Sequence, residues 1–365
     1  MINQKFSSQS IHIITIHSIH NFGSVFQSYA LVKYLTNSGY DAKLIDYQPL
    51  YYFSGRSLLS KVVSIALNPL QYKRQYDKYK FFIDYYIPKT NKKFRKEEEL
   101  KNYYKDVVNS VFIAGGDQLW NNYHPCGNDD AYKLTFASEV KKIAFGTSMG
   151  RNTFTNEELS RIASAIKDFS FVGLREQSTV SMLAPFSQVT PCHVVDPVLL
   201  LDKEEYLNFI DRTPLIKEPY LVMYLAPKSS LLDYVVNYIA EQRGLKVVHV
   251  CGFTAKCKCD YFLRDTGPKD LLNLIYNADF VVSASFHATL FSLLFNKQFC
   301  SLLPGEKTNT RIEDLLSYYG LEHRIIRKES DCVKLKDSID FIPVNSEMRK
   351  FVEQSRTMLL DIINN

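Results

Sequence analysis

Short apolar runs alternate along this chain with segments of helical spacing. Near the start, residues 11–17 predict a buried strand, residues 24–38 a helix that Gly39 stops, and residues 42–47 a second strand. This β–α–β order predicts parallel strands joined by helices. Further buried strands are expected at 107–114, 142–145, 171–175 and 193–196.

A second alternating series follows a charged stretch that contains Pro214 and Pro219. It predicts strands at 220–224, 246–251 and 280–283, and helices at 231–243, 269–277 and 289–296. Because the interruption resembles a boundary between domains, we predict two α/β domains with mainly parallel sheets. The expected domains are 1–205, with a basic aromatic insertion at 50–105, then 206–345, and a C-terminal helix at 346–365 that could pack back on the N-terminal domain.

The segment NADFVVSASFHATLFSLL, residues 277–294, carries the most information. Its apolar strand is interrupted by Ser283, Ser285 and His287 and then resumes with helical spacing. Open α/β sheets bind ligands beyond the carboxyl ends of their strands, where the next helix also presents free N–H groups. His287 is therefore our first candidate for proton transfer. The spacing alone fits equally well a histidine buried in the core against a backbone carbonyl.

The formal net charge of +5 over 365 residues is unevenly distributed. Residues 71–105 contain eleven Lys and Arg, five Asp and Glu, and ten Tyr and Phe. Such a surface suits anionic headgroups, a polyprenyl-phosphate-linked substrate or nucleic acid. We favour a solvated helix face above packed aromatic side chains. A peripheral contact with a membrane surface is the second interpretation, and we expect no nucleic-acid partner.

Several functional classes are disfavoured. The first residues lack an apolar signal segment, and the apolar window 280–295 is too short and too polar for a membrane span, so we expect a cytoplasmic protein, peripheral at the inner face of the membrane if attached at all. Seven irregularly placed cysteines indicate reduced thiols. The spacing of Cys251, Cys257 and Cys259 matches no common zinc site, so we expect no metal. The first turn lacks the G-x-G-x-x-G fingerprint, which disfavours NAD and FAD.

Several stretches, read together, resemble the polysaccharide pyruvyl transferase family. They occur in order between residues 20 and 324 and are HNFGSVFQSYAL, IDYQP, AGGDQLWN, IAFGTSMG, GLREQS, VVDPVLLL, NADFVVSASFHATLFSLLFNK and NTRIEDLLSYYGLEHR. Their order along most of the chain is far more specific than any one motif.

This resemblance implies a bacterial enzyme of exopolysaccharide or capsule synthesis with two Rossmann-like domains facing a cleft, similar to the GT-B arrangement. The implied donor is phosphoenolpyruvate, used as a co-substrate with no further cofactor, and the acceptor is a lipid-linked or nucleotide-linked sugar that receives pyruvate as a ketal. The family's Ser-x-Arg-x-His segment maps onto residues 283–287, with its histidine at His287. Here Ser285 stands where many members carry arginine, so the donor contact of that arginine must come from another residue or be absent.

The chemistry calls for an acid and for cations. Ketal formation from an enol phosphate requires protonation of the methylene carbon, which His287 could supply. Arg311 and Asn309 lie in a segment typical of an anion-binding helix start, Lys307 would act as a point charge, and Arg175 could bind the donor in bidentate fashion. For Arg175 we favour the alternative of a surface ion pair with Glu176.

A second group of candidates follows strand 107–114. Gly115 and Gly116 allow the backbone to approach a ligand, Asp117 could orient a sugar hydroxyl or act as a base, and Gln118 completes the turn. Asn21 and Gly23 could face the cleft, although a turn alone would explain both. For Trp120 we favour a core anchor over stacking on a sugar.

Two alternative functions stay open at this point. One is a glycosyltransferase of the same two-domain shape that uses a nucleotide-sugar donor. The other is a catalytically silent carbohydrate-binding or assembly protein.

Overall fold

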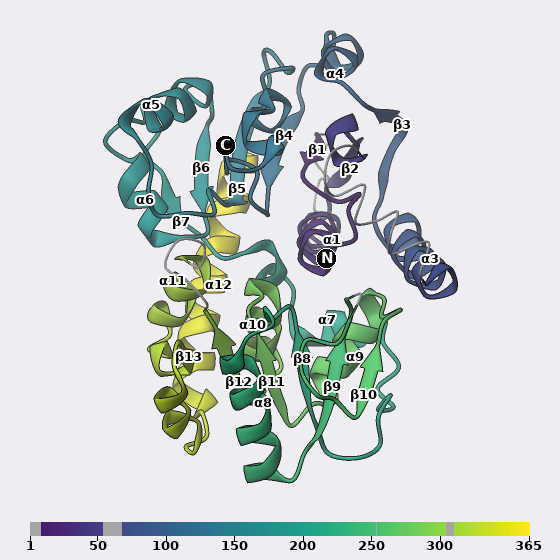
Figure 1. Cartoon of the computed structure of the whole chain (residues 1–365). Coiled ribbons are helices and arrows are strands. Elements are labelled where there is room, and N and C mark those ends of the chain that lie inside the picture. Colours follow the sequence, from purple (N-terminus) through teal and green to yellow (C-terminus); the bar gives the residue numbers. More distant parts are fainter. Residues whose placement is uncertain (1–8, 54–67, 253, 304–309) are drawn as a thin grey trace, which may run out of the picture. The chain divides into compact units, whose positions relative to one another are not determined.

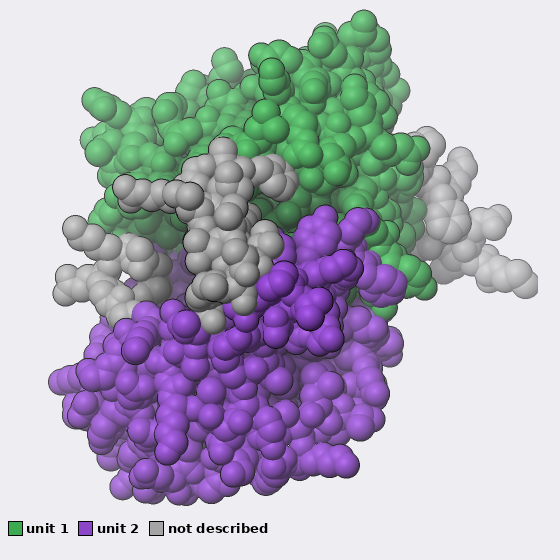
Figure 2. All heavy atoms as spheres, turned by 45° about the vertical axis from the view of Figure 1, so that its right-hand side comes forward, with its two compact units in different colours: residues 1–58, 82–201, 349–365 green, residues 59–81, 202–348 purple. Residues whose placement is uncertain are grey.

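The computed structural model describes residues 9–53, 68–252, 254–303 and 310–365. The chain divides into two compact units, which Figure 2 colours separately. Unit 1 comprises residues 1–58, 82–201 and 349–365, and unit 2 comprises residues 59–81 and 202–348. The domain boundaries expected from the sequence stay predictions, because compact packing is not a measure of independent folding.

Unit 1 is built on a seven-stranded parallel sheet with the order β3-β2-β1-β4-β5-β6-β7 (Figure 1). Its strands are β1 (Ser10–Ile14), β2 (Asp41–Tyr47), β3 (Lys89–Phe94), β4 (Val111–Gly115), β5 (Lys141–Thr147), β6 (Phe171–Leu174) and β7 (Cys192–His193). The order reverses between β1 and β4. Ligands of doubly wound sheets bind at such a switch point, beyond the carboxyl ends of the strands.

Helices and 3-10 turns connect these strands. They are α1 (Phe22–Asn37), η1 (Leu50–Phe53), α3 (Pro69–Tyr86), α4 (Glu97–Tyr104), η2 (Pro125–Asn128), η3 (Asp130–Lys133), α5 (Asn156–Ala165), α6 (Gln177–Leu183) and η4 (Pro197–Leu200). Helix α1 begins at the switch point and is buried over most of its length. Its first turn therefore lies beside the loop that follows β4.

Unit 2 repeats this topology with a six-stranded parallel sheet in the order β10-β9-β8-β11-β12-β13. Its strands are β8 (Tyr220–Tyr224), β9 (Lys246–Val250), β10 (Tyr261–Leu263), β11 (Phe280–Ser283), β12 (Gln298–Leu302) and β13 (Ile325–Ile326). Its helices are α7 (Lys203–Leu207), α8 (Ser230–Arg243), α9 (Pro268–Asn277), α10 (Phe286–Leu294), α11 (Thr310–Tyr318), η5 (Glu322–Arg324) and η6 (Glu329–Leu335). Here the switch point lies between β8 and β11.

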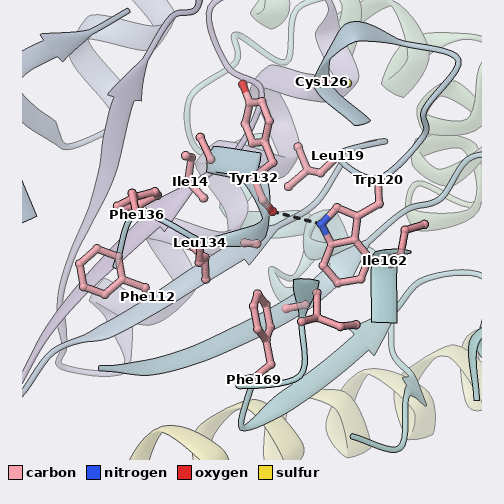
Figure 3. Close-up of a cluster of buried hydrophobic side chains, with 14 of the residues drawn as sticks. Ile14, Phe112, Leu119, Trp120, Cys126, Tyr132, Leu134, Phe136, Ile162 and Phe169 are labelled. Carbon is pink, nitrogen blue, oxygen red and sulfur yellow. Dashed lines mark hydrogen bonds between the residues drawn. The ribbon is translucent and has the colours of Figure 1, made fainter. Parts of the chain in front are cut away.

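Trp120 anchors the core of unit 1, as the favoured interpretation of the sequence predicted. The side chain is fully buried, and its indole Nε1 donates a hydrogen bond to the carbonyl of Tyr132 at 3.1 Å (Figure 3). Phe169 packs edge-on against the indole with ring centres 6.3 Å apart. A ring enclosed in this way cannot stack on a sugar.

Three sequence-based boundaries are wrong. Strand β4 begins at Val111, because Asn109 adopts a left-handed conformation (φ 54°) that breaks the extended run. The expected strand at 193–196 is only two residues long, since Asp196 caps η4 instead. Helix α10 begins at Phe286 and not at 289, so His287 lies within its first turn.

The last helix, α12 (Phe341–Asn364), starts five residues earlier than predicted. Its C-terminal part belongs to unit 1. There Ser355 Oγ accepts a hydrogen bond from the amide of Val195 at 3.1 Å, and the guanidinium of Arg356 donates to the carbonyl of Leu200 at 2.8 Å. Unit 1 is therefore completed by the end of the chain.

Helix α3 carries the basic aromatic segment. Its aromatic side chains are divided: Tyr79 and Phe82 are almost fully buried, whereas Phe81 and Tyr85 are 54% and 70% exposed. The helix thus has packed aromatics beneath it, as favoured from the sequence, and further aromatics on its solvent face. Within the described residues no helix combines the length and apolar character needed to cross a bilayer.

Candidate functional site

In unit 2 the residue at the switch point is Ser283, the last residue of β11. Its hydroxyl donates to the carbonyl of Tyr224 at the end of β8 at 2.6 Å and accepts from the amide of Ser285 at 3.0 Å. Ser283 is buried. The hydroxyl therefore ties together the two strands on either side of the switch point and fixes the turn into α10.

Ser285 is the N-cap of α10. Its hydroxyl accepts a hydrogen bond from the amide of Ala288 at 3.4 Å, and its carbonyl accepts from the hydroxyl of Thr289 at 3.1 Å. Serine is a preferred N-cap because its short side chain reaches the unpaired N–H groups of the first turn. Ser285 therefore starts the helix that carries His287.

His287 is 8% exposed in the first turn of α10, and its ring meets that of Phe286 edge-on with centres 5.2 Å apart. Arg311, at the start of α11, places its guanidinium carbon 5.8 Å from the centre of the Phe286 ring. The structure thus gathers His287 and Arg311 around one aromatic ring. Two further predicted donor contacts, Lys307 and Asn309, lie outside the described residues.

In unit 1 the predicted glycine turn lies at the switch point. Gly116 has a φ of +65°, and a Cβ there would come within 1.7 Å of Gln27 Oε1, so only glycine fits. Gly115 is equally confined, because its Cβ would meet the side chain of Leu31 at 2.3 Å. The glycine backbone after β4 is therefore packed closely against side chains of α1.

Asp117 follows in a left-handed conformation and is 8% exposed. One carboxylate oxygen accepts from the hydroxyl of Ser24 in α1, and the other accepts from the amide of Gln118 at 2.8 Å. Gln118 in turn accepts a hydrogen bond from the side chain of Asn121 at 2.8 Å. The carboxylate of Asp117 is thus oriented by two donors, the hydroxyl of Ser24 at the start of α1 and the amide of Gln118 in its own loop.

Asn21 and Gly23 lie in the same place. The side-chain oxygen of Asn21 caps α1 by accepting from the amides of Gly23 at 2.9 Å and Ser24 at 3.3 Å. The local turn accounts for both residues, as the sequence allowed. Any contact of theirs with a ligand stays a prediction.

The predicted ion pair of Arg175 with Glu176 is present, but its predicted place at the surface is wrong, because both side chains are buried. Its Nη1 lies 2.6 Å from Asp196 and its Nε lies 3.2 Å from Glu176. Burial alone would lower the pKa of Arg175, but the charges of Asp196, Glu176 and Asp117 raise it. Arg175 therefore links the ends of β6 and β7 to the Asp117 loop electrostatically, and its binding role stays a prediction.

Sequence reasoning missed the pair His17 and Asp46. The ring of His17 bonds Asp46 Oδ1 through Nε2 at 2.9 Å and the carbonyl of Thr15 through Nδ1 at 3.2 Å. The ring of His17 therefore joins the carboxylate of Asp46 to the backbone at Thr15. Burial would raise the pKa of Asp46, but the hydrogen bond and charge of His17 lower it. The sequence did contain a signal for this pair, because His17 and Asp46 each lie at the end of one of two predicted neighbouring strands.

The cysteine-rich loop of unit 2 contains no metal cluster among the residues that the structure describes. His249 Nε2 accepts a hydrogen bond from the amide of Lys256 at 3.3 Å. Burial lowers the pKa of His249 to about 4. The Cys251 thiol accepts from Gln75 of α3 at 3.3 Å, and burial raises its pKa to about 12.

Comparisons with known proteins bear on both units. The family model described as "Polysaccharide pyruvyl transferase" matches residues 21–305. A search of curated protein sequences finds no match.

Among solved structures, UDP-N-acetylglucosamine 2-epimerase from Rickettsia bellii is similar with a TM-score of 0.56 at 12% identity, covering 97% of this chain and 95% of that one. UDP-GlcNAc 2-epimerase from Neisseria meningitidis, bound to UDP-GlcNAc, gives a TM-score of 0.53 at 9% identity, covering 97% and 99%. The enzyme of the same name from Methanocaldococcus jannaschii gives 0.52 at 11% identity, covering 90% and 91%. At such identities the likeness establishes the fold alone, and this fold is GT-B-like.

Proposed function

Because the chain belongs to the polysaccharide pyruvyl transferase family, we propose that it transfers pyruvate from phosphoenolpyruvate to a sugar of a bacterial surface polysaccharide precursor. The product is a pyruvyl ketal, which links two sugar oxygens through one carbon. The observation that carries the proposal is the family match, which covers α1 and β4 of unit 1, β8 and β11 of unit 2, and His287. We place the reaction in the cytoplasm, where phosphoenolpyruvate is available.

The proposed reaction balances without a metal or redox cofactor. The methylene carbon of phosphoenolpyruvate gains a proton, and the first sugar hydroxyl bonds to the cationic carbon that results. The bond to phosphate then breaks, and the second hydroxyl bonds to the same carbon. The two sugar hydroxyls release two protons. One of them reprotonates the acid that protonated the methylene carbon, and the other leaves with phosphate.

We assign the protonation step to His287. Imidazole exchanges protons near neutral pH, and a positioned acid contributes about 10²- to 10⁴-fold to the rate. The ring is held against Phe286 in the first turn of α10, where free N–H groups favour a neighbouring anion. The phosphate of the donor would thus lie beside the acid.

We assign a contact with the donor's carboxylate or phosphate to Arg311, which takes over the role of the arginine missing at Ser285. The guanidinium group forms two parallel hydrogen bonds with such anions. Its position over Phe286 supports this assignment. Lys307 and Asn309 remain proposed donor contacts.

In unit 1 we propose that Asp117 binds acceptor hydroxyls. The loop of Gly115, Gly116 and Gln118 would supply backbone contacts, with Asn21 and Gly23 across the switch point. The carboxylate already accepts from Ser24 and Gln118, so we favour orientation of a hydroxyl over proton abstraction. The positive charge of Arg175 would stabilise the negative charge of Asp117 in this loop.

The acceptor is proposed to be carried on a lipid or a nucleotide. For a lipid-linked acceptor, the exposed Phe81 and Tyr85 of α3, among basic side chains, would contact the membrane surface. Mass spectrometry of products from lipid-linked and nucleotide-linked sugars identifies the carrier. Co-sedimentation with anionic vesicles, compared between the unmodified protein and Phe81→Ser/Tyr85→Ser, tests the membrane contact.

The central experiment is the release of phosphate from phosphoenolpyruvate in the presence of sugar acceptors. We expect His287→Gln to lower turnover by about 10²- to 10⁴-fold while acceptor binding stays intact. His323→Gln is the matched control, because His323 is an exposed histidine of the same unit. Equal turnover of the two variants would remove His287 from the mechanism.

A glycosyltransferase with a nucleotide-sugar donor is the competing function, because the fold is shared with enzymes named for UDP-GlcNAc. We expect phosphoenolpyruvate to raise the thermal unfolding midpoint and nucleotide sugars not to. The reverse pattern would contradict the proposal. A carbohydrate-binding or assembly protein would bind acceptor but release no phosphate.

A further inference from the structure

Tyr123, in the loop that follows β4, is an exposed aromatic residue with an unusual support. The residue is 67% exposed, whereas Trp120, three positions earlier, is fully buried. Single exposed apolar side chains are common on proteins and need no explanation by themselves. Tyr123 differs because of the side chain that lies against its ring.

That side chain is Arg151, from the loop after β5. Its guanidinium carbon lies 4.3 Å from the centre of the Tyr123 ring and 3.9 Å from the centre of the Phe154 ring. The guanidinium is thus in close contact with two aromatic rings. Such contacts hold both rings in place through attraction between the cation and the π-electrons.

Arg151 itself cannot move freely. It is only 4% exposed, and its guanidinium donates to Glu158 Oε1 at 2.7 Å, to the side-chain oxygen of Asn122 and to the carbonyl of Thr153 at 2.8 Å. The carboxylate of Glu158 also offsets its charge. Tyr123 therefore rests on a fixed support that offers no uncompensated cation to a phosphate.

This support lies at the carboxyl edge of the sheet in unit 1. The loops after β4 and β5 are joined by two backbone hydrogen bonds, from Ser148 N to the carbonyl of Asp117 at 2.9 Å and from Trp120 N to the carbonyl of Ser148 at 3.3 Å. The amide of Tyr123 donates to the side chain of Asn121 at 3.1 Å. The exposed ring is consequently part of the same hydrogen-bonded loop as Asp117.

We propose that Tyr123, supported by Arg151, is a stacking platform for a sugar ring of the acceptor. Tyrosine combines an apolar ring with a polar hydroxyl, which matches the apolar C–H face and the hydroxyl edge of a sugar. The neighbouring His124 is also exposed, and its ring can donate to or accept from a hydroxyl group. Tyr123 is a binding residue that contributes to acceptor specificity, and it takes no part in proton transfer.

The proposal rests on the proposed function only for the identity of the acceptor, so its test measures binding without phosphoenolpyruvate. Saturation-transfer difference NMR is recorded with lactose, maltose and chitobiose as sugar probes and with UDP as a nucleotide probe. The proteins are the unmodified chain, Tyr123→Ala, Tyr123→Trp and the control Tyr234→Ala, which removes an exposed tyrosine of α8. Thermal unfolding of each variant verifies folding.

We expect at least one disaccharide to bind the unmodified protein and Tyr234→Ala. Tyr123→Ala should weaken that binding roughly two- to tenfold, as for the loss of one aromatic contact, and Tyr123→Trp should retain it. Equal binding by Tyr123→Ala, binding of none of the sugars by the unmodified protein, or a Tyr123-dependent signal from UDP alone would each overturn the proposal. Failure to release phosphate from phosphoenolpyruvate would contradict the proposed function and leave this result unaffected.

Discussion

At the residue scale, small changes of identity decide how each switch point is built. Ser285 caps α10, while Arg311 of α11 lies over the ring of Phe286, the first residue of the same helix. In unit 1 the backbone of the loop after β4 carries two successive left-handed residues, Gly116 and Asp117. Glycine adopts this conformation without strain, whereas at Asp117, which has a side chain, it stores strain of the kind common at ligand-binding sites.

Gly116 should tolerate replacement poorly, because it combines a left-handed backbone with a close neighbour. Gly116→Ala combines a positive φ with a Cβ 1.7 Å from Gln27, so we expect a loss of unfolding free energy of about 3 kcal/mol or more. Gly244→Ala is the matched control, because it has a φ of +64° but no atom within 4 Å, and should cost about 1 kcal/mol. Urea denaturation measures both, and equal losses would show that the contact with Gln27 relaxes freely.

At the element scale, both catalytic candidates depend on how a helix begins. Asn21 caps α1, and Ser285 caps α10. These N-caps determine where the free N–H groups of each helix point, and hence where an anion or a carboxylate can lie. The start of α1 is already beside the carboxylate of Asp117, whereas α10 carries His287 in its first turn.

Replacing the cap of α1 separates its structural role from a ligand contact. Asn21→Ala should lower the free energy of unfolding by about 1 kcal/mol, because two amides lose their acceptor. Asn21→Asp keeps the cap and should retain most of this stability. If Asn21 also binds the acceptor, the KM for acceptor will rise in both variants; an unchanged KM would restrict Asn21 to capping.

At the scale of the whole molecule, the chain is not divided into consecutive halves. Unit 1 receives its last piece from residues 349–365, and unit 2 receives residues 59–81 of the basic aromatic insertion. Two of the points at which the chain passes from one unit to the other, after residues 81 and 348, lie within the helices α3 and α12. Neither the spacing of apolar residues nor the distribution of charge along the sequence indicates a crossing inside a helix.

Removing the end of the chain should destabilise unit 1. A protein that ends at residue 348 would lose the buried side chains of Phe351, Val352, Leu359 and Ile363, each worth about 1.5–3 kcal/mol. That sum approaches the about 5–15 kcal/mol that stabilises a typical domain. We expect limited proteolysis to degrade residues 82–201 first. Equal protection of both units in the truncated protein would show that α12 is dispensable.

The sequence alone determined the parallel α/β class, most strands and helices, and the family, whereas the catalytic role of His287 stays a prediction. It could do so because buried strands and amphipathic helices have periods that are set locally, and because the family motifs are contiguous. The sequence pattern did not indicate that the chain leaves the extended conformation at Asn109 or that Asp196 caps η4. At both places the local conformation differs from the strand that the apolar pattern predicted.

Only the tertiary structure decided the strand order, and with it the two switch points. It also showed that Arg175 is buried between two carboxylates, that His17 pairs with Asp46, and that Tyr123, not Trp120, is the exposed aromatic residue of its loop. Each of these facts joins residues far apart along the chain or depends on which side of a loop faces the core. Such contacts follow from packing, which a linear pattern does not encode.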